Sequence, residues 1–509
     1  MAKKRSFTVL KTFAALFIFA AASALTFAVK GTTAKLLISI PLAWSIFGAA
    51  LITARAHSLS VEHFASLAER ESTTTRFLSW ATLALILIAL LNGATGPGDA
   101  ALYASQIEVG DLEERAIHWG YFLYAQICNQ LIPGTVDLTL NIASAIAGCV
   151  GLLGLTALFM DFTGSALLSS AIAIGICLCP TFLFCSLYAN SYLVQAVAGY
   201  WAFVLFRKNK PFLAGLVFGY ALTVSIASIV LAPLFLLPSE PRHRWRDQGQ
   251  ALASCFLGFI LIYGLFFCRH WPSLLYGDRG LLDLGMNSVR EDGQMLPGLL
   301  SHAKQLVGGF PVLLPFAIYC LLWLLRNRRL SLAWLIPTLV CLALYLVTSG
   351  GAAAWGFLLP VIPLLFLPIA AWAYRREEGK TQAAFYRAAI IFVTVVCNAI
   401  CSMLVWPPSD QFRGPASRAV AFANIGARLG PNVYPLGEYT GAYLRANRRL
   451  FLGASEDPVE SARPGEYVIM DESTLLKLES QPDRLQMISQ VTDGKVRVWH
   501  VRLLPKKDH

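Results

Sequence analysis

Residues 1–406 consist of long apolar blocks separated by short polar segments. An apolar helix of about 20 residues crosses a hydrocarbon core of roughly 30 Å. Inside lipid the backbone polar groups must be satisfied within the segment, so such blocks form helices. The pattern predicts about thirteen spans, with cores at 10–29, 35–54, 77–94, 137–160, 164–185, 188–206, 212–223, 226–237, 250–268, 311–325, 330–348, 356–374 and 385–405.

Lys and Arg residues gather in the short segments between these blocks. Such segments remain in the cytoplasm by the positive-inside rule. Because basic segments at 207–210 and 242–246 flank the stretch 212–237, we predict a hairpin of two short helices that meet near Ser225. The N-terminus then lies in the cytoplasm, and the loops 95–136 and 269–310 lie outside together with the C-terminal tail.

The tail, residues 407–509, has a different pattern. It begins with two prolines and is strongly charged, with strand-like runs at 432–436, 466–470 and 495–504 and helix-like stretches at 416–429 and 473–490. The predicted fold class is therefore a polytopic α-helical membrane protein with a small extracytoplasmic α/β C-terminal domain. The predicted domains are a membrane domain, 1–406, and a soluble domain, 407–509.

Composition agrees with this division. Only 14% of the 509 residues are charged, against about 25% in soluble proteins, and 56% are hydrophobic. The net charge of +11 is explained by the basic loops, so no nucleic-acid partner is predicted. Almost all of the 11 cysteines lie in apolar segments, where cysteine packs as a small hydrophobic residue. No metal ligands are predicted among them.

The outer loop 95–136 carries the first candidate for chemistry. Asp99 directly follows a span on a Gly-Pro-Gly turn, where membrane-bound and aqueous groups meet. A carboxylate at this place could take a proton from an attacking hydroxyl. The alternative is that Asp99 only caps a helix that begins at Ala100. Further along the loop, His118 precedes a short helix, 122–131, with one apolar face.

Several short motifs resemble bacterial glycosyltransferases of the GT-C superfamily. The first is Asp99-Ala-Ala-Leu-Tyr-Ala followed by His118-Trp-Gly-Tyr-Phe-Leu-Tyr, which is similar to the first-loop pattern of the protein O-mannosyltransferase-like and aminoarabinose-transferase-like groups. The others follow in the family's order: Asn141-Ile-Ala-Ser-Ala, Tyr188-Ala-Asn-Ser-Tyr-Leu, Trp355-Gly-Phe-Leu-Leu-Pro-Val-Ile-Pro and Val433-Tyr-Pro-Leu-Gly-Glu-Tyr.

This resemblance implies an inverting glycosyltransferase of the cytoplasmic (inner) membrane. Asp99 would be the general base that activates an acceptor hydroxyl on a glycan, a lipid or a protein. The donor would be a sugar linked to polyprenyl phosphate, bound at the outer face of the bilayer. The pattern departs from the family at Ala100 and Asn190, where the family has acids, so a requirement for Mg²⁺ or Mn²⁺ is left open.

Candidate substrate-binding residues lie in both outer loops and in the turn between two spans. They are His118, Tyr188, Asn190, Arg269, Arg279 and Arg290. The arginines could hold the lipid phosphate, since guanidinium groups pair well with phosphate oxygens. The competing interpretations are an interfacial anchor for His118, packing for Tyr188 and a solvated loop for the arginines.

Two other functions compete with glycosyl transfer. A transporter or lipid flippase would fit the broken helices at 212–237. However, the spans contain almost no ionisable residues, which transport pathways usually need. The second alternative is a non-catalytic assembly or sensor protein that uses the tail as a binding module.

Overall fold

The structure is a computed structural model of the full chain. It describes residues 61–94, 96, 99–109, 118–236, 245–270, 303, 306–327, 332–349, 358–373, 381–405, 414–430, 432–436, 443, 464–469, 475, 485–493 and 496–504. The predicted spans 10–29 and 35–54 lie outside these residues.

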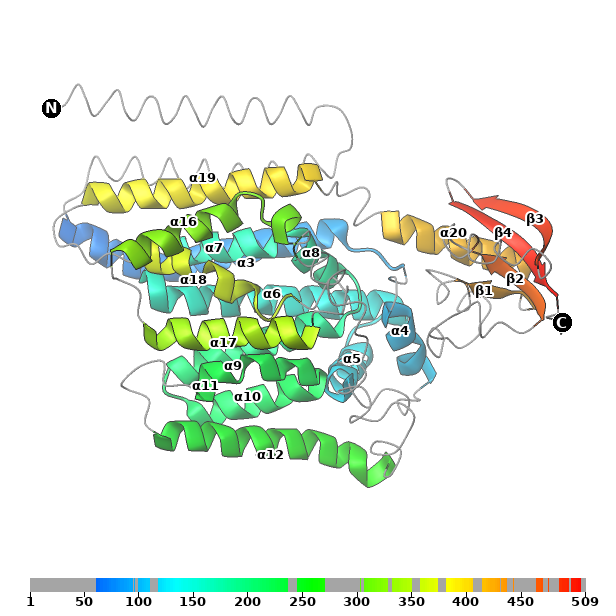
Figure 1. The fold of residues 1–509 in the computed structure, drawn as a ribbon, viewed down its shortest axis with the longest axis horizontal. Coiled ribbons are helices and arrows are strands. Elements are labelled where there is room, and N and C mark those ends of the chain that lie inside the picture. The colour runs from blue at the N-terminus through cyan, green and yellow to red at the C-terminus, as the bar shows by residue number, and fades with distance from the viewer. Residues whose placement is uncertain are drawn as a thin grey trace, which may run out of the picture.

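A bundle of roughly parallel and antiparallel helices forms the larger part of the structure, and a small sheet lies at one end of it (Figure 1). The helices of the bundle are α3 (Val61–Leu90), α4 (Asp99–Val109), α5 (Trp119–Leu131), α6 (Val136–Thr163), α7 (Ala166–Cys177), α8 (Pro180–Leu187), α9 (Ser191–Arg207), α10 (Pro211–Val224), η2 (Ile226–Leu231), α11 (Pro233–Leu236), α12 (Trp245–His270), α16 (Leu313–Arg326), α17 (Leu332–Ser349), α18 (Ile362–Ala373) and α19 (Thr381–Val405).

Each predicted span from 77–94 onward coincides with a helix or with a pair of helices. The span predicted at 164–185 is the pair α7 and α8, which bend by 74° at Cys179-Pro180. Proline begins α8 because its missing N–H is not needed in a first turn. Within the described residues, α6 is long and apolar enough to cross a membrane alone, and the bent pair passes the same test as one span. The count of about thirteen stays a prediction.

The chain reverses at Ser225, where the sequence predicts a hairpin. Ser225 has the extended backbone that ends α10, and Ser228 Oγ donates a hydrogen bond to Ala221 O at 2.9 Å. This bond folds η2 back onto the last turn of α10. At the far end of the returning segment, Gln248 of α12 donates to Leu236 O at 3.1 Å.

Helices α10 and α12 approach each other closely along glycines spaced four residues apart. A Cβ atom on Gly219 would lie 2.3 Å from Cys255 O, and one on Gly215 would lie 2.1 Å from Ala251 O. Small residues at this spacing let two membrane helices bring their backbones together. The close packing of α10 on α12 therefore depends on these two glycines.

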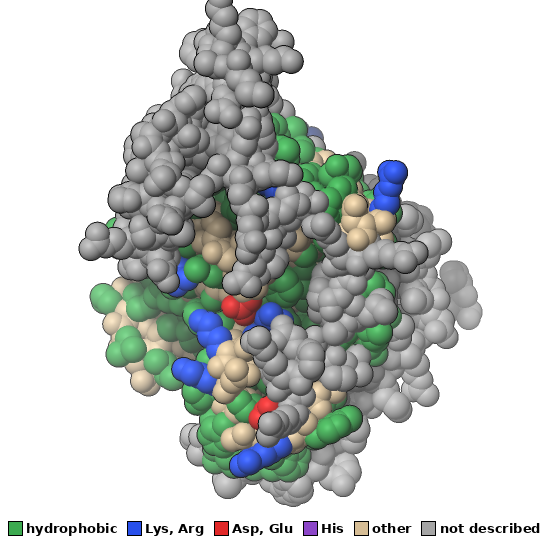
Figure 2. Space-filling view, turned by 90° about the vertical axis from the view of Figure 1, so that its left-hand side faces the viewer, with side chains coloured by type: hydrophobic (Ala, Val, Ile, Leu, Met, Phe, Trp, Pro, Cys, Tyr) green, Lys and Arg blue, Asp and Glu red, His purple; other side chains and the backbone are tan. Residues whose placement is uncertain are grey.

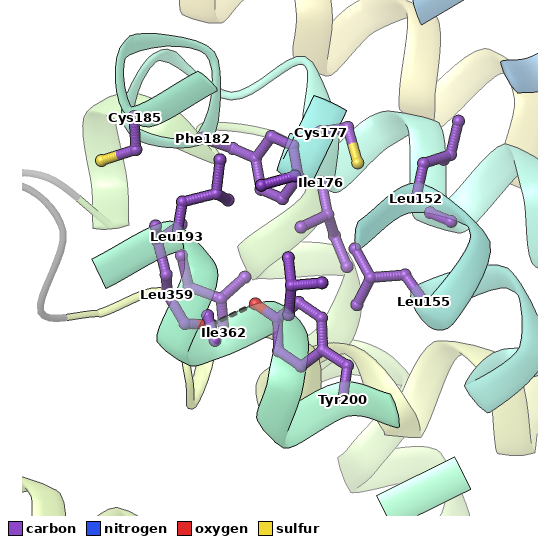
Figure 3. Close-up of a cluster of buried hydrophobic side chains, with 14 of the residues drawn as sticks. Leu152, Leu155, Ile176, Cys177, Phe182, Cys185, Leu193, Tyr200, Leu359 and Ile362 are labelled. Atoms are coloured by element: carbon purple, nitrogen blue, oxygen red, sulfur yellow. Dashed lines mark hydrogen bonds between the residues drawn. The ribbon is translucent and has the colours of Figure 1, made fainter. Parts of the chain in front are cut away.

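The core of the bundle lies among α6, α8, α9 and α18. Figure 3 shows Tyr200 of α9 among Leu155, Ile176 and Ile362, with its hydroxyl donating to Leu359 O. The bond satisfies a buried phenol and fixes the turn that precedes α18. This turn belongs to the Leu-Leu-Pro motif singled out in the sequence.

Basic side chains gather at the end of the bundle opposite the sheet, as Figure 2 shows. Arg207 pairs with Asp161 at 3.2 Å, and Arg76 donates to Met160 Sδ at 3.1 Å, so the middle of α3 meets the C-terminal ends of α6 and α9 there. Four other basic residues are exposed: Lys208 and Lys210, between α9 and α10, Arg246 in the first turn of α12 and Arg326 at the end of α16. The basic residues at this end agree with its prediction as the cytoplasmic side. The orientation in the membrane stays a prediction.

The tail forms helix α20 (Gly414–Leu429) and a four-stranded sheet. Its strands are β1 (Tyr434–Leu436), β2 (Gly465–Ile469), β3 (Leu485–Asp493) and β4 (Val496–Leu503), in the order β1-β2-β4-β3. Only β1 and β2 are parallel. Phe422 and Ile425 of α20 pack against Val468 and Val498 on one face of the sheet.

The helix predicted at 473–490 is partly wrong, because residues from Leu485 onward form β3. The sequence Asp493-Gly494 between two runs rich in β-branched residues is a hairpin signal. Residues 485–493 form a strand and not a helix because they pair with β4 over the whole length of β3. Strand β3 is an exposed edge with a register shift between Met487 and Ser489.

Candidate active site

The segment that leads into α4 is packed tightly against the turn between α8 and α9. Gly96 is buried, and a Cβ atom there would lie 2.8 Å from Ala100 Cβ and 2.9 Å from Tyr188 Cδ1. Only glycine lets the backbone come so near. Gly96 thus brings the segment before α4, whose first residue is Asp99, against the predicted site residue Tyr188.

A single buried amide ties this segment to the α8–α9 turn. Asn141 of α6 is 1% exposed, and its Nδ2 donates to Asn92 O at 2.9 Å and to Ala94 O at 3.1 Å. Its Oδ1 accepts from Ala189 N at 3.2 Å. Asn141 therefore holds the approach to Asp99 and the predicted site turn in one arrangement.

Tyr103 lies one turn after the start of α4 and connects it to α5 and α9. Its ring lies 4.6 Å from Tyr121, 5.5 Å from Phe122 and 6.0 Å from His118, measured between ring centroids. Its hydroxyl shares a 3.0 Å hydrogen bond with Ser191 Oγ. These aromatic contacts fix the rotation of α4 about its axis, and so the face of the helix on which residue 99 lies.

His118 anchors the start of α5. Its Nδ1 lies 2.7 Å from Val224 O at the end of α10. Because a carbonyl oxygen only accepts, Nδ1 carries the proton, and Nε2 is an acceptor in the neutral ring. A Cβ atom on the nearby Gly120 would lie 2.3 Å from Thr223 Oγ1, so α5 also needs glycine at this position.

Asn190 and Tyr121 complete the group. The Asn190 side chain caps α9 by accepting from Tyr192 N at 2.8 Å. Burial raises the pKa of Tyr121, while its hydrogen bonds to the Asn190 backbone and to Ser144 act in the opposite direction. The Tyr121 hydroxyl therefore remains protonated and links α5 to the turn that holds Asn190.

One departure from the family pattern has a local explanation. Ala100, where the family has a second acid, is 3% exposed and packs against Gly96 and the surrounding hydrophobic core. A carboxylate in that position would be buried, and burying an unpaired charge costs several kcal/mol or more. The close packing at Gly96 therefore requires a small residue at position 100.

The structure thus gathers the start of α4 with His118, Tyr188 and Asn190 at the end of the bundle where the sheet lies (Figure 1). Arg269 is the penultimate residue of α12. Arg279 and Arg290 lie outside the described residues. Among the residues that are described, no group of three or more His, Cys, Asp or Glu side chains is placed to hold a metal ion.

Sequence reasoning missed the residues that connect these elements. Tyr103 stands within the first-loop motif four positions after Asp99, and Asn141 opens the next motif, so both had a signal. A polar cluster on the tail could not be predicted from the sequence pattern. There Glu466 pairs with Arg502 at 2.6 Å and with His500 at 3.2 Å across β2 and β4.

The fold is similar to that of ArnT, in agreement with the resemblance seen in the motifs. The chain is similar to ArnT from Cupriavidus metallidurans in its apo state, with a TM-score of 0.55 and 15% identity over 84% of this chain and 98% of that one. Against ArnT bound to undecaprenyl phosphate the TM-score is 0.52, with 14% identity over 87% and 98% of the two chains. No family model and no curated protein matches the chain.

Proposed function

We propose that this chain is an inverting glycosyltransferase. It moves a sugar from a polyprenyl-phosphate-linked donor to an acceptor hydroxyl on a glycan, lipid or protein. The observation that supports the proposal is that α4 begins at Asp99. The chain just before this helix is held by hydrogen bonds from Asn141 and by the contact of Gly96 with Tyr188, within a fold that covers 98% of the ArnT chain.

In the proposed reaction the Asp99 carboxylate takes the proton of the acceptor hydroxyl. The acceptor oxygen attacks the anomeric carbon, the bond between that carbon and the phosphate oxygen breaks, and the lipid phosphate leaves with the electron pair. Attack opposite the leaving group inverts the anomeric configuration. A positioned base typically contributes 10²–10⁴-fold. His118, Tyr188, Asn190, Arg269, Arg279 and Arg290 remain proposed donor- and acceptor-binding residues.

We further propose that the site lies at the outer face of the bacterial cytoplasmic membrane. The basic helix ends gather on the opposite end of the bundle, as the positive-inside rule would require of the cytoplasmic side. The sheet of the tail lies at the same end as α4 and α5 (Figure 1). In this arrangement residues 407–509 form an extracytoplasmic domain beside the site.

The test is replacement of Asp99 by Asn in the purified full-length protein. Sugar transfer from a polyprenyl-phosphate donor should fall by about 10²–10⁴-fold, because the amide cannot accept the proton. Asp137→Asn is the matched control, since it removes the same charge from the first turn of α6. Undiminished transfer by Asp99→Asn would exclude the base. Substrate flux without a glycosyl product would favour a transporter or lipid flippase.

A further inference from the structure

Gln106 of α4 is a buried amide that none of the described interactions satisfies. The residue is 4% exposed, and neither its Nε2 nor its Oε1 has a hydrogen-bond partner among the described residues. Buried polar side chains in folded proteins nearly always have a partner. A pair of unmade hydrogen bonds in the interior therefore requires an explanation.

The position of Gln106 on α4 points toward the candidate active site. Residues 99, 103 and 106 are spaced four and three apart, so they share one face of the helix. Tyr103 on this face contacts His118 and Tyr121, which shows that the face is turned toward α5. Gln106 thus belongs to the same side of α4 as the proposed base.

The length of the glutamine side chain brings its amide closer to the start of α4. Seven residues correspond to about 10 Å along a helix. Helical side chains lean toward the N-terminus, so a long side chain reaches back by about one turn. The remaining separation along the helix is comparable with the width of one sugar ring.

The hydrogen-bonding groups of a primary amide indicate which kind of ligand Gln106 can bind. Gln106 offers two donor hydrogens and one carbonyl acceptor but no charge. It matches hydroxyl groups, which both donate and accept, and it cannot neutralise a phosphate. Resting on the proposed function, we propose that Gln106 hydrogen-bonds sugar hydroxyls in the active site and so selects the sugar. The bound sugar hydroxyls would supply the hydrogen bonds that the Gln106 amide lacks among the described residues.

The variant Gln106→Leu tests this, because leucine is of similar size but cannot hydrogen-bond. Binding to the full-length protein is measured with undecaprenyl phosphate, with undecaprenyl phosphate carrying a hexose, and with a methyl hexoside as an acceptor mimic. We expect the variant to lose about tenfold in affinity for at least one sugar-bearing probe, as removal of neutral hydrogen bonds does. Affinity for bare undecaprenyl phosphate should stay within about twofold of the parent value on the same reasoning.

Four results are distinguished. A loss only with the lipid-linked hexose assigns Gln106 to the donor sugar, and a loss only with the methyl hexoside assigns it to the acceptor. Unchanged affinity for both sugar probes, or an equal loss for the bare lipid, would overturn the proposal. Gln126→Leu on α5 is the control, because that side chain also has a carbonyl oxygen without a partner among the described residues but is less buried.

The proposal can fail without the proposed function failing. If the parent protein transfers sugar and depends on Asp99 while Gln106→Leu binds both sugar probes normally, only the role of Gln106 is lost. If the parent protein transfers no sugar and Asp99→Asn changes nothing, the glycosyltransferase assignment itself is lost. The thermal midpoint of Gln106→Leu should be equal to or above that of the parent, because an unpaired buried amide is removed.

Discussion

Asn141 and Asn398 are two buried asparagines that use their amides in opposite ways, and replacing each by Asp should separate them. Asn141 donates two hydrogen bonds, to Asn92 O and Ala94 O, and accepts one from Ala189 N. Asn398 of α19 accepts two, from Val312 N and Leu313 N at 3.1 and 3.0 Å, and donates one to Gly309 O. A carboxylate keeps the acceptors and loses the donors.

The number of bonds lost sets the magnitude. An unsatisfied buried polar group costs about 1–3 kcal/mol. Asn141→Asp leaves two carbonyls without a donor, which corresponds to about 2–6 kcal/mol on that scale. Asn398→Asp leaves one, at about 1–3 kcal/mol, and both Asp variants also bury a carboxylate, which costs several kcal/mol. At position 398 the N-terminus of α16 offsets part of this cost, because negative charge is favoured there. The corresponding Leu variants remove all three bonds at each position and should be similarly destabilised.

The assay is the midpoint of denaturant unfolding of each purified variant in detergent, together with sugar transfer. We expect the Asp variant to recover more of the stability lost in the Leu variant at position 398 than at position 141. Transfer by the folded fraction should fall for Asn141→Asp, since the approach to Asp99 is released, and should persist for Asn398→Asp. Equal recovery at the two positions would refute the reasoning from donors and acceptors.

The remaining predictions concern helix packing and the tail. Gly219→Ala should lower the unfolding midpoint, because the new Cβ would lie 2.3 Å from Cys255 O and push α10 away from α12 by about 1 Å. Gly249→Ala, with no atom within 4 Å of its Cβ, should be neutral or stabilising by up to about 1 kcal/mol. An equal loss in both variants would contradict this. The Arg502 guanidinium and His500 hold the pKa of Glu466 below its usual value of 4.5, so the stability from this cluster should be present above that pH and lost as the pH falls through the lowered pKa. Arg502→Met should reduce this acid dependence of thermal unfolding, and an unchanged pH profile would exclude the pair as its source.

Much of the fold could be predicted from the sequence because the apolar blocks and basic loops obey simple rules. The hairpin at Ser225 followed from charge alone, since basic residues on both sides of 212–237 require the chain to return. The bend between α7 and α8 could not be predicted from hydropathy, although Pro180 marked its position. Strand β3 was missed because the helix-like composition before residue 490 outweighed the pairing that β4 supplies.

The candidate site could be predicted only in part. Asp99, His118, Tyr188 and Asn190 stood out through motifs that resemble a family. The contacts that bring them together involve Asn141 and Tyr103, whose partners lie far away in the sequence. A pattern read along one chain shows which residues are unusual, but the partner of a buried amide depends on tertiary packing.

The three hydrogen bonds of Asn141 also impose an order on biosynthesis. They join backbone groups at residues 92 and 94 to one at residue 189, so about a hundred residues must be made between the first and the last partner. At roughly 5–20 residues per second the ribosome needs about 5–20 s for this stretch. During that interval the segment before Asp99 has left the ribosome without its final contacts. We therefore expect it to take its final conformation only after α8 has been synthesised and inserted.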